Sequence, residues 1–278
     1  MSISGILFCS QTNIEIFGGI MFITTAGRTN ETMMIKAKNI AEELQIPYIS
    51  RKKMSIQSLQ QFMKDDCIVV GKERLELFPL GAGEPFFFHP NSSMFRIKRL
   101  MEGENDPFVD ACQLKKGKHF LDCTLGLASD SIVASYMVGD EGKVVGIEGE
   151  RYLAYLTIRG LKSWKSDVSE FNSACERIVV VQRLSIDYLK KLKDDSFDIV
   201  YFDPMFHEPI TESDGIRGLS RLAIYDDIGE ELIEQAKRVA RERVVLKDHF
   251  RSKRFERYGF QVKKRKTAKF HFGVMRIQ

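Results

Sequence analysis

Leu121-Asp122-Cys123-Thr124-Leu125-Gly126-Leu127-Ala128-Ser129-Asp130 carries the clearest structural signal in this chain of 278 residues. An apolar run leads into Asp122, and residues 131–137 have the apolar spacing of a helix. The pattern predicts a strand, a tight loop and a helix. Open α/β sheets bind nucleotides at such loops, at the carboxyl ends of their strands. An ordinary strand-to-helix turn can have the same pattern, so this stretch does not identify a ligand.

The residue types in the loop distinguish between two classes of nucleotide. A dinucleotide pyrophosphate requires closely spaced glycines so that the backbone can approach the phosphates. Only Gly126 is present, since Thr124 and Ala128 stand where further glycines are expected. Asp122 would repel a phosphate at the strand end. It suits a cationic ligand such as S-adenosylmethionine (SAM), which has an ammonium and a sulfonium group but no phosphate.

A second acid ends the next predicted strand, Lys143-Val144-Val145-Gly146-Ile147-Glu148. In a βαβ unit, a carboxylate at this position faces the ribose and accepts hydrogen bonds from its two hydroxyls. The alternative is that Glu148 is a solvated residue at a strand end. Together with Asp122, it favours a nucleoside site.

The composition is typical of a globular protein, with 44% hydrophobic and 29% charged residues. The formal charge of +4 is small, so any affinity for nucleic acid must come from local clustering. Such a cluster lies between residues 251 and 269 and is opposed by Glu256 alone: Arg251, Lys253, Arg254, Arg257, Lys263, Lys264, Arg265, Lys266 and Lys269. The cluster faces either a polyanion or only solvent.

The five cysteines are scattered and contain no C-x-x-C pair, which predicts reduced thiols in the cytoplasm and no zinc or other metal site. No apolar run is long enough to cross a membrane. Residues 1–20 are apolar but have no basic residue before Arg28, so they lack the basic start of a signal peptide. Met21 is an alternative start, and residues 1–20 are expected to be a dispensable extension.

The order of elements predicts two α/β units. Residues 21–105 should form a small accessory module on the substrate side, and residues 106–278 the SAM-binding domain, with a linker near residues 101–107. In the first unit we expect strands near 21–25, 47–49, 67–70, 75–78 and 86–90, and helices near 31–44, 56–63 and 93–101. In the second we expect helices near 108–114, 129–138, 151–162, 186–193 and 226–241. Its strands are expected near 118–123, 143–148, 177–182, 197–202, 242–247, 258–264 and 268–276.

Repeated strand–helix units predict a doubly wound, mostly parallel sheet, here with seven strands. The last two strands should form an antiparallel hairpin. A parallel sheet that ends in such a hairpin is the Rossmann-like layout of class I methyltransferases.

The strand predicted at residues 197–202 is almost wholly apolar and ends in Asp203-Pro204-Met205-Phe206. This resembles the Asp/Asn-Pro-Pro-Tyr/Phe loop of methyltransferases that act on exocyclic amino groups of bases. Such an amine is a poor nucleophile because its lone pair is delocalised into the ring. Asp203 and the Pro204 carbonyl would accept its N–H bonds, with Asp203 as the eventual proton acceptor, and Phe206 would stack on the base. The alternative is that Asp-Pro only ends a strand in a turn.

These motifs, together with Val244-Val245-Leu246-Lys247, resemble the bacterial small-subunit ribosomal RNA guanine-N2 methyltransferase family over about residues 118–250. The resemblance implies a fold of class I, transfer of a methyl group from SAM to a guanine, and ribosomal RNA or the small ribosomal subunit as the partner. It implies these cofactor contacts: Ser129, Asp130, Glu148, Gly149, Leu184, Ser185 and Asp203. Asp122 and Gly126 join them from the loop pattern, and Lys247 is a candidate donor to a base carbonyl.

The chain departs from that family at Ala128 and Ser129, where the family has glycine and arginine, and at residues 207–209, where the family is rich in lysine. Two alternatives therefore stay open. One is a SAM-dependent methyltransferase for a protein or a small molecule, and the other is a non-catalytic RNA-binding module. An NAD-dependent oxidoreductase is disfavoured because the glycine spacing is missing. The sequence does not determine the oligomeric state.

Overall fold

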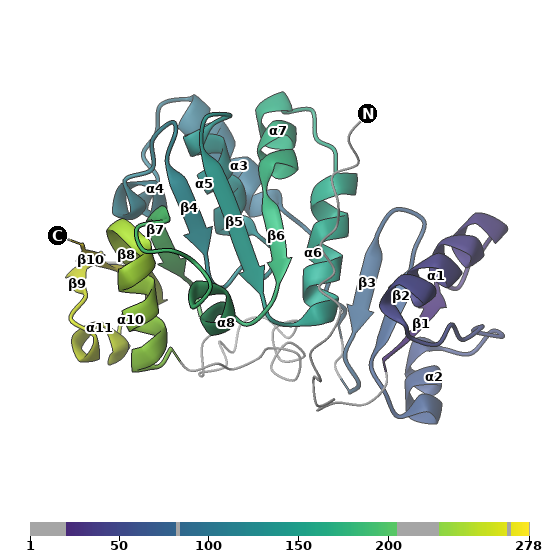
Figure 1. Cartoon of the computed structure of the whole chain (residues 1–278). Coiled ribbons are helices and arrows are strands. Elements are labelled where there is room, and N and C mark those ends of the chain that lie inside the picture. The colour runs from purple at the N-terminus through teal and green to yellow at the C-terminus, as the bar shows by residue number, and fades with distance from the viewer. Residues whose placement is uncertain (1–20, 82–83, 205–227, 266–267, 278) are drawn as a thin grey trace.

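The computed structural model describes residues 21–81, 84–204, 228–265 and 268–277, which form a seven-stranded sheet and a separate three-stranded sheet (Figure 1). The strand order of the large sheet is β6-β5-β4-β7-β8-β10-β9. Its strands are β4 (His119–Asp122), β5 (Lys143–Glu148), β6 (Val179–Gln182), β7 (Phe197–Phe202), β8 (Ala240–His249), β9 (Gln261–Lys263) and β10 (Phe270–Arg276). The neighbouring strands β6, β5, β4, β7 and β8 are all parallel to one another. Strand β10 is antiparallel to its two neighbours, β8 and β9.

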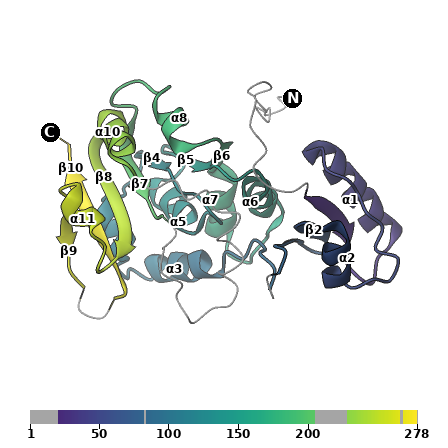
Figure 2. The same ribbon diagram turned by 90° about the horizontal axis from the view of Figure 1, so that it is seen from below.

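Helices cover both faces of the large sheet, as Figure 2 shows from below. One face packs against α4 (Pro107–Cys112), α5 (Ser129–Val138), α6 (Arg151–Ser163) and α7 (Ser169–Arg177), and α3 (Asn91–Met101) lies outside α5. The other face packs against α8 (Ser185–Leu189), α10 (Glu230–Val239) and α11 (Arg254–Arg257). Strand β7 is buried at both faces, because Tyr201 and Phe202 alternate between the two cores and neither is exposed to solvent.

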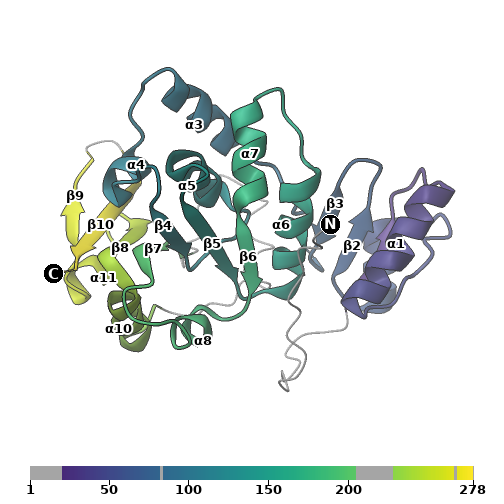
Figure 3. The same ribbon diagram turned by 45° about the horizontal axis from the view of Figure 1, so that its top comes forward.

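The small sheet has the order β1-β2-β3 and lies beside α6, as Figure 3 shows. It consists of β1 (Phe22–Thr25), β2 (Cys67–Val70) and β3 (Leu75–Phe78), and it is accompanied by α1 (Glu31–Leu44) and α2 (Ile56–Met63). Asn30 caps α1 by accepting a hydrogen bond from the Met33 N–H at 2.9 Å. A hydrophobic core shared with Tyr155 and Leu156 of α6 attaches this sheet to the larger one.

The structure confirms the class I methyltransferase layout, including the parallel sheet and its antiparallel end. Several details of the prediction were wrong. The strands expected near 47–49 and 86–90 are single bridges at Tyr48 and Phe86. Helix α7 was not predicted, because Phe171, Ala174 and Cys175 give it only two turns of apolar spacing. The predicted division at residues 105 and 106 stays a prediction, and α3 on its N-terminal side packs against α5 of the large sheet.

Candidate functional site

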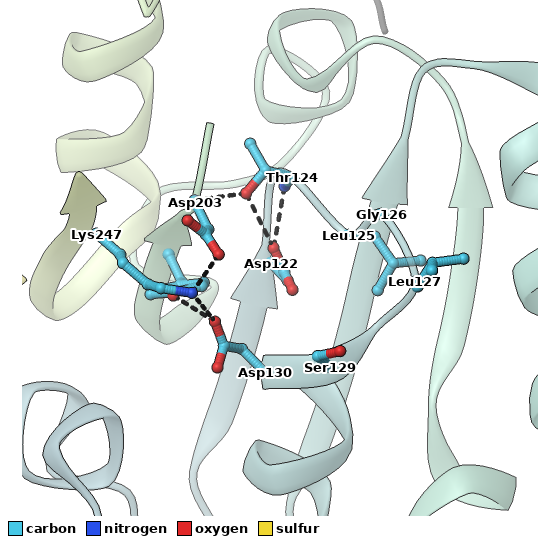
Figure 4. A pocket seen from close by; sticks show the side chains of 10 residues that line it. Asp122, Thr124, Leu125, Gly126, Leu127, Ser129, Asp130, Asp203 and Lys247 are labelled. Carbon is cyan, nitrogen blue, oxygen red and sulfur yellow. Dashed lines mark hydrogen bonds and ion pairs between the residues drawn. The ribbon is translucent and has the colours of Figure 1, made fainter. Parts of the chain in front are cut away.

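A pocket of about 200 Å³ opens at the carboxyl ends of β4, β7 and β8 (Figure 4). Parallel strands place their carboxyl ends at one edge of the sheet, so residues far apart in the sequence meet there. The pocket is lined by Asp122, Thr124, Leu125, Gly126, Leu127, Ser129, Asp130, Tyr201, Asp203 and Lys247. The predicted loop 122–130 therefore forms one wall, and Tyr201, Asp203 and Lys247 from β7 and β8 form the other.

Asp122 organises the loop by accepting hydrogen bonds at both carboxylate oxygens. The Thr124 N–H donates to Oδ1 at 3.0 Å, and the Ser131 hydroxyl donates to Oδ2 at 2.7 Å. The Thr124 hydroxyl oxygen in turn accepts a hydrogen bond from the Asp203 N–H at 2.6 Å, which ties the tip of β4 to the tip of β7. Burial raises the pKa of Asp122 to about 7, although the bonds from Ser131 and Thr124 oppose this shift.

The backbone of the loop depends on two left-handed residues and on a supporting acid. Gly126 has φ +51°, and Ala128 has φ +62°. Glu148 accepts hydrogen bonds from the Gly126 N–H and the Glu150 N–H, both at 2.9 Å. Gly146 of β5 lies under the loop, and a Cβ atom there would be 2.3 Å from Leu125 Cδ1. Ala128 stands where the resembled family has glycine, and its left-handed backbone is strained because it carries a Cβ atom.

Lys247 joins the two walls of the pocket. Its Nζ donates to Asp203 Oδ2 at 2.5 Å and to Asp130 Oδ2 at 3.1 Å, and Figure 4 shows it pointing between them. Asp130 also accepts from the Tyr201 hydroxyl at 2.7 Å and from Arg96 Nη1 at 2.6 Å. Arg96 belongs to α3, so this outer helix contributes a cation that binds Asp130 of the pocket lining.

Among the residues that the structure describes, carboxylates outnumber cations in and behind the pocket. The network contains the cations Arg96 and Lys247, and its carboxylates are Asp106, Asp122, Asp130 and Asp203. Burial raises the pKa of Asp203 to about 6 in spite of the nearby Lys247 ammonium. The pKa of Asp130 lies below its usual range because the attraction of Lys247 and Arg96 exceeds the effect of burial. A ligand that brings positive charge would relieve this excess, whereas a phosphate would add to it.

The donor set therefore fits SAM, whose ammonium and sulfonium groups are cationic. Asp122 and Asp203 present carboxylates to the pocket, and Lys247, the one cation that lines it among the residues the structure describes, is already bound to two carboxylates. Glu148, at the end of the neighbouring strand, accepts hydrogen bonds from the backbone of the loop and of residue 150, and a carboxylate has about four acceptor positions in all.

The structure brings together some of the residues predicted to form the site and leaves others outside the pocket. Those that line it are Asp122, Gly126, Ser129, Asp130 and Asp203. Those that do not are Glu148, Gly149, Pro204, Leu184 and Ser185. Ser185, at the start of α8, donates its hydroxyl to the Cys123 carbonyl at 2.5 Å. Phe206 lies outside the described residues.

Two features of the site were not predicted from sequence. Arg96 lies in the helix predicted near residues 93–101 and was given no role in the site, because no local pattern connects it with Asp130 in a different helix. Lys247 was predicted to donate to a base carbonyl, whereas in the structure it is bound to Asp130 and Asp203. The position of Lys247 directly after the apolar run Val244-Val245-Leu246 could have indicated a partly buried charge pair. The sequence does not show which residues would be its partners.

Within the described parts of the chain, no group of three or more His, Cys, Asp or Glu residues is arranged to hold a metal ion. No helix there combines the length and the apolarity that crossing a membrane requires. The four described cysteines, Cys67, Cys112, Cys123 and Cys175, are buried and free.

The chain is similar to known proteins along most of its length. Residues 52–272 match the family model described as "Putative SAM-dependent methyltransferase". The protein YpiP of Bacillus subtilis is 49% identical over 91% of this chain and 98% of its own. Ribosomal RNA small subunit methyltransferase J of Legionella pneumophila is 27% identical over 81% of this chain and 86% of its own. The fold is shared with a SAM-dependent methyltransferase from Neisseria gonorrhoeae, at 18% identity and a TM-score of 0.59 over 92% of this chain and 95% of that one.

Proposed function

This chain belongs to the SAM-dependent methyltransferase family, and from this premise we propose that it methylates the exocyclic N2 amine of a guanine in small-subunit ribosomal RNA. Membership of this family gives the general activity, which is methyl transfer from SAM. The RNA substrate is supported by the likeness to ribosomal RNA small subunit methyltransferase J over most of both chains. The observation that carries the proposal is the Asp203 carboxylate, which lies at the pocket wall directly before Pro204.

The residues of the loop and of the neighbouring strand would hold the cofactor. Asp122 offers a buried carboxylate to its positive charge, and Glu148 offers acceptor oxygens to the ribose hydroxyls. The cofactor, when bound, supplies an electrophilic methyl group on a sulfonium. Because Asp122 has a pKa of about 7, we expect cofactor affinity to fall as the pH drops below this value and the carboxyl loses its charge.

Asp203 would make the guanine amine a better nucleophile. Its carboxylate would accept a hydrogen bond from the N2 amine, and this holds electron density on the nitrogen. Lys247 fixes the orientation of the carboxylate through its 2.5 Å bond to Oδ2. Methyl transfer would break the bond between the methyl carbon and the sulfonium sulfur, which would leave as a neutral thioether. Asp203 would accept the proton that the methylated amine then releases. A pKa of about 6 leaves Asp203 largely ionised at neutral pH and able to act as a base.

The test of this role compares Asp203→Ala with Asp203→Asn. Alanine removes both the acceptor and the base, so we expect the rate of methyl transfer to fall by about 100-fold or more. Asparagine keeps one carbonyl acceptor and should retain more activity than alanine. Cofactor affinity, measured by calorimetry, should change much less than the rate in both variants. Equal turnover of Asp203→Ala and the unchanged protein would remove Asp203 from the mechanism.

The test of the substrate uses SAM with a tritiated methyl group. Small ribosomal subunits and bare ribosomal RNA are prepared from a strain without this chain and incubated with the purified protein. We expect label in RNA, and nuclease digestion followed by mass spectrometry should give N2-methylguanosine at one position. Label in ribosomal protein alone, or a different methylated nucleoside, would contradict the proposal.

The accessory role of residues 21–105 belongs to the same proposal. Their shared core with α6 includes Leu127, which also lines the pocket, so the module borders the cofactor loop. We propose that it lies on the substrate side and contributes to RNA binding. The ribosomal RNA partner implies a cytoplasmic location, as the unpaired cysteines also predict.

A further inference from the structure

A group of aromatic rings with a cation beside it lies at the end of β8, close to the pocket. The rings of His249 and Phe250 have centroids 4.5 Å apart, and the Phe270 ring is 6.3 Å from His249. Phe250 is 45% exposed, and the guanidinium carbon of Arg251 lies 5.0 Å from the centre of its ring. We call His249, Phe250, Arg251 and Phe270 the aromatic–basic surface.

This surface lies at the same edge of the sheet as the pocket. Strands β7 and β8 are parallel, so β8 ends where Asp203 follows β7. Lys247, which lines the pocket, and His249 are two residues apart on β8 and therefore point to the same face, about 7 Å apart along the strand. Phe270 pairs directly with His249 across the antiparallel ladder. A polymer with one unit in the pocket would reach the surface within a few units.

The charge around the rings selects a polyanion. Arg251, Lys253, Lys263 and Lys264 are exposed, and none of them pairs with a carboxylate among the residues that the structure describes. Asp248, the acid directly before His249 in β8, is buried and already bound to Arg254 and Ser252. Exposed rings beside unpaired cations are the arrangement with which proteins hold single-stranded nucleic acid, because bases stack on the rings and cations contact phosphates.

We propose that the aromatic–basic surface binds a single-stranded segment of RNA that flanks the methylated nucleotide, with a base stacked on Phe250 and a phosphate held by Arg251. The inference rests on the proposed function, since it takes the methylated base to lie in the pocket beside Asp203. It adds a second contact with RNA outside the pocket, which would set the affinity for RNA and leave the affinity for SAM unchanged.

The experiment measures binding of a labelled single-stranded RNA of twelve nucleotides by fluorescence anisotropy, with Phe250→Ala, Phe250→Trp and Arg251→Gln. We expect Phe250→Ala to weaken binding about tenfold, and Phe250→Trp to bind within about twofold of the unchanged protein. Arg251→Gln should lower the slope of log Kd against log salt by about 0.7, the value for one phosphate of a single strand. Calorimetry should give the same SAM affinity for all variants.

The control is Val179→Ala. Val179 is 52% exposed and is the first residue of β6, so it lies at the amino end of a parallel strand, away from the pocket and outside residues 21–105. Its replacement should leave RNA binding unchanged. Equal RNA affinity for Phe250→Ala and Val179→Ala would overturn the inference. So would equal weakening of Phe250→Trp and Phe250→Ala, since that result would show loss of local structure and not of a stacking ring.

Failure of this inference is distinguishable from failure of the proposed function. If RNA is methylated with the same KM by Phe250→Ala and the unchanged protein, the function stands and the aromatic–basic surface is wrong. If no RNA is methylated but Phe250→Ala still weakens RNA binding relative to Val179→Ala, the surface stands and the methylation substrate is wrong.

Discussion

Asp122 gives the first prediction, because its burial opposes its charge. Its pKa of about 7 in the folded protein lies above the ordinary value of 3.8, so the folded state binds a proton more tightly than the unfolded state. The resulting stability is present at low pH and is lost as the pH rises through 7. At pH 8 and without cofactor, the free energy of unfolding of Asp122→Asn should therefore be about 2 kcal/mol higher than that of the unchanged protein.

Urea denaturation at several pH values checks this expectation. The difference in the free energy of unfolding between Asp122→Asn and the unchanged protein should narrow as the pH falls from 8 to 5, where Asp122 of the folded protein is itself neutral. Ser131 can accept a hydrogen bond from the asparagine amide, so the isosteric variant keeps the contacts of the loop. Cofactor affinity should fall about tenfold or more at pH 8. A variant that is less stable than the unchanged protein at every pH would contradict this account.

Lys247 gives the second prediction. It is the common partner of Asp130 and Asp203, so Lys247→Met would leave the buried Asp130 carboxylate and the partly buried Asp203 carboxylate without their ammonium. Removing one partner of a buried charge pair costs about 3–5 kcal/mol of stability. We expect a loss of this order at pH 8, measured by urea unfolding. Adding Asp203→Asn to Lys247→Met should recover part of the loss, and a double variant no more stable than Lys247→Met would argue against coupling between the two residues.

The loop between β4 and α5 depends on its neighbour β5, and this gives the third prediction. Gly146→Ala places a methyl group against Leu125, which lines the pocket. We expect a loss of about 1–3 kcal/mol of stability and a cofactor affinity lowered about tenfold, because the loop must move. Gly273→Ala is the matched control. Gly273 lies in β10 and does not line the pocket, and a methyl group there would be 2.6 Å from the Phe255 ring of α11. It should lose similar stability without a change in cofactor affinity.

Helix α6 joins the two sheets and gives the fourth prediction, for the molecule as a whole. Leu156 is buried in the core shared with the small sheet, and Leu161 is buried in the core of the large sheet. Each replacement by alanine should cost about 2–4 kcal/mol. Hydrogen exchange should quicken mainly in β1 and β2 for Leu156→Ala, and mainly in α5 and α7 for Leu161→Ala. The same exchange pattern in both variants would mean that the two sheets open as one unit.

Hydrogen bonds from Tyr155 and Arg159 of α6 to Glu43 of α1 reinforce this attachment. Burial opposes the charge of Glu43, yet these bonds keep its pKa below the ordinary value. The contact brings together residues more than a hundred positions apart in the chain, so no sequence pattern could have shown it.

Much of the architecture was predictable from sequence because strand and helix periodicity are local properties. The apolar run of residues 197–202 predicted a central strand, and the structure places it between β4 and β8. The acids at the ends of β4, β5 and β7 were also visible, since each directly follows an apolar strand. The short helix α7 was not predictable, because two turns of helix give too few apolar positions to identify a period.

Local patterns thus led to the fold class, the strand-end acids and a cationic ligand, whereas the partners of those acids came from tertiary contacts. Asp130 was predicted to contact the cofactor, and it lines the pocket. The partners of its carboxylate, Arg96, Tyr201 and Lys247, come from three other elements and could not be predicted. The pKa values of Asp122 and Asp203 likewise depend on burial. The physical reason is that charge pairing and desolvation act through space, so they are settled only when distant segments of the chain pack together.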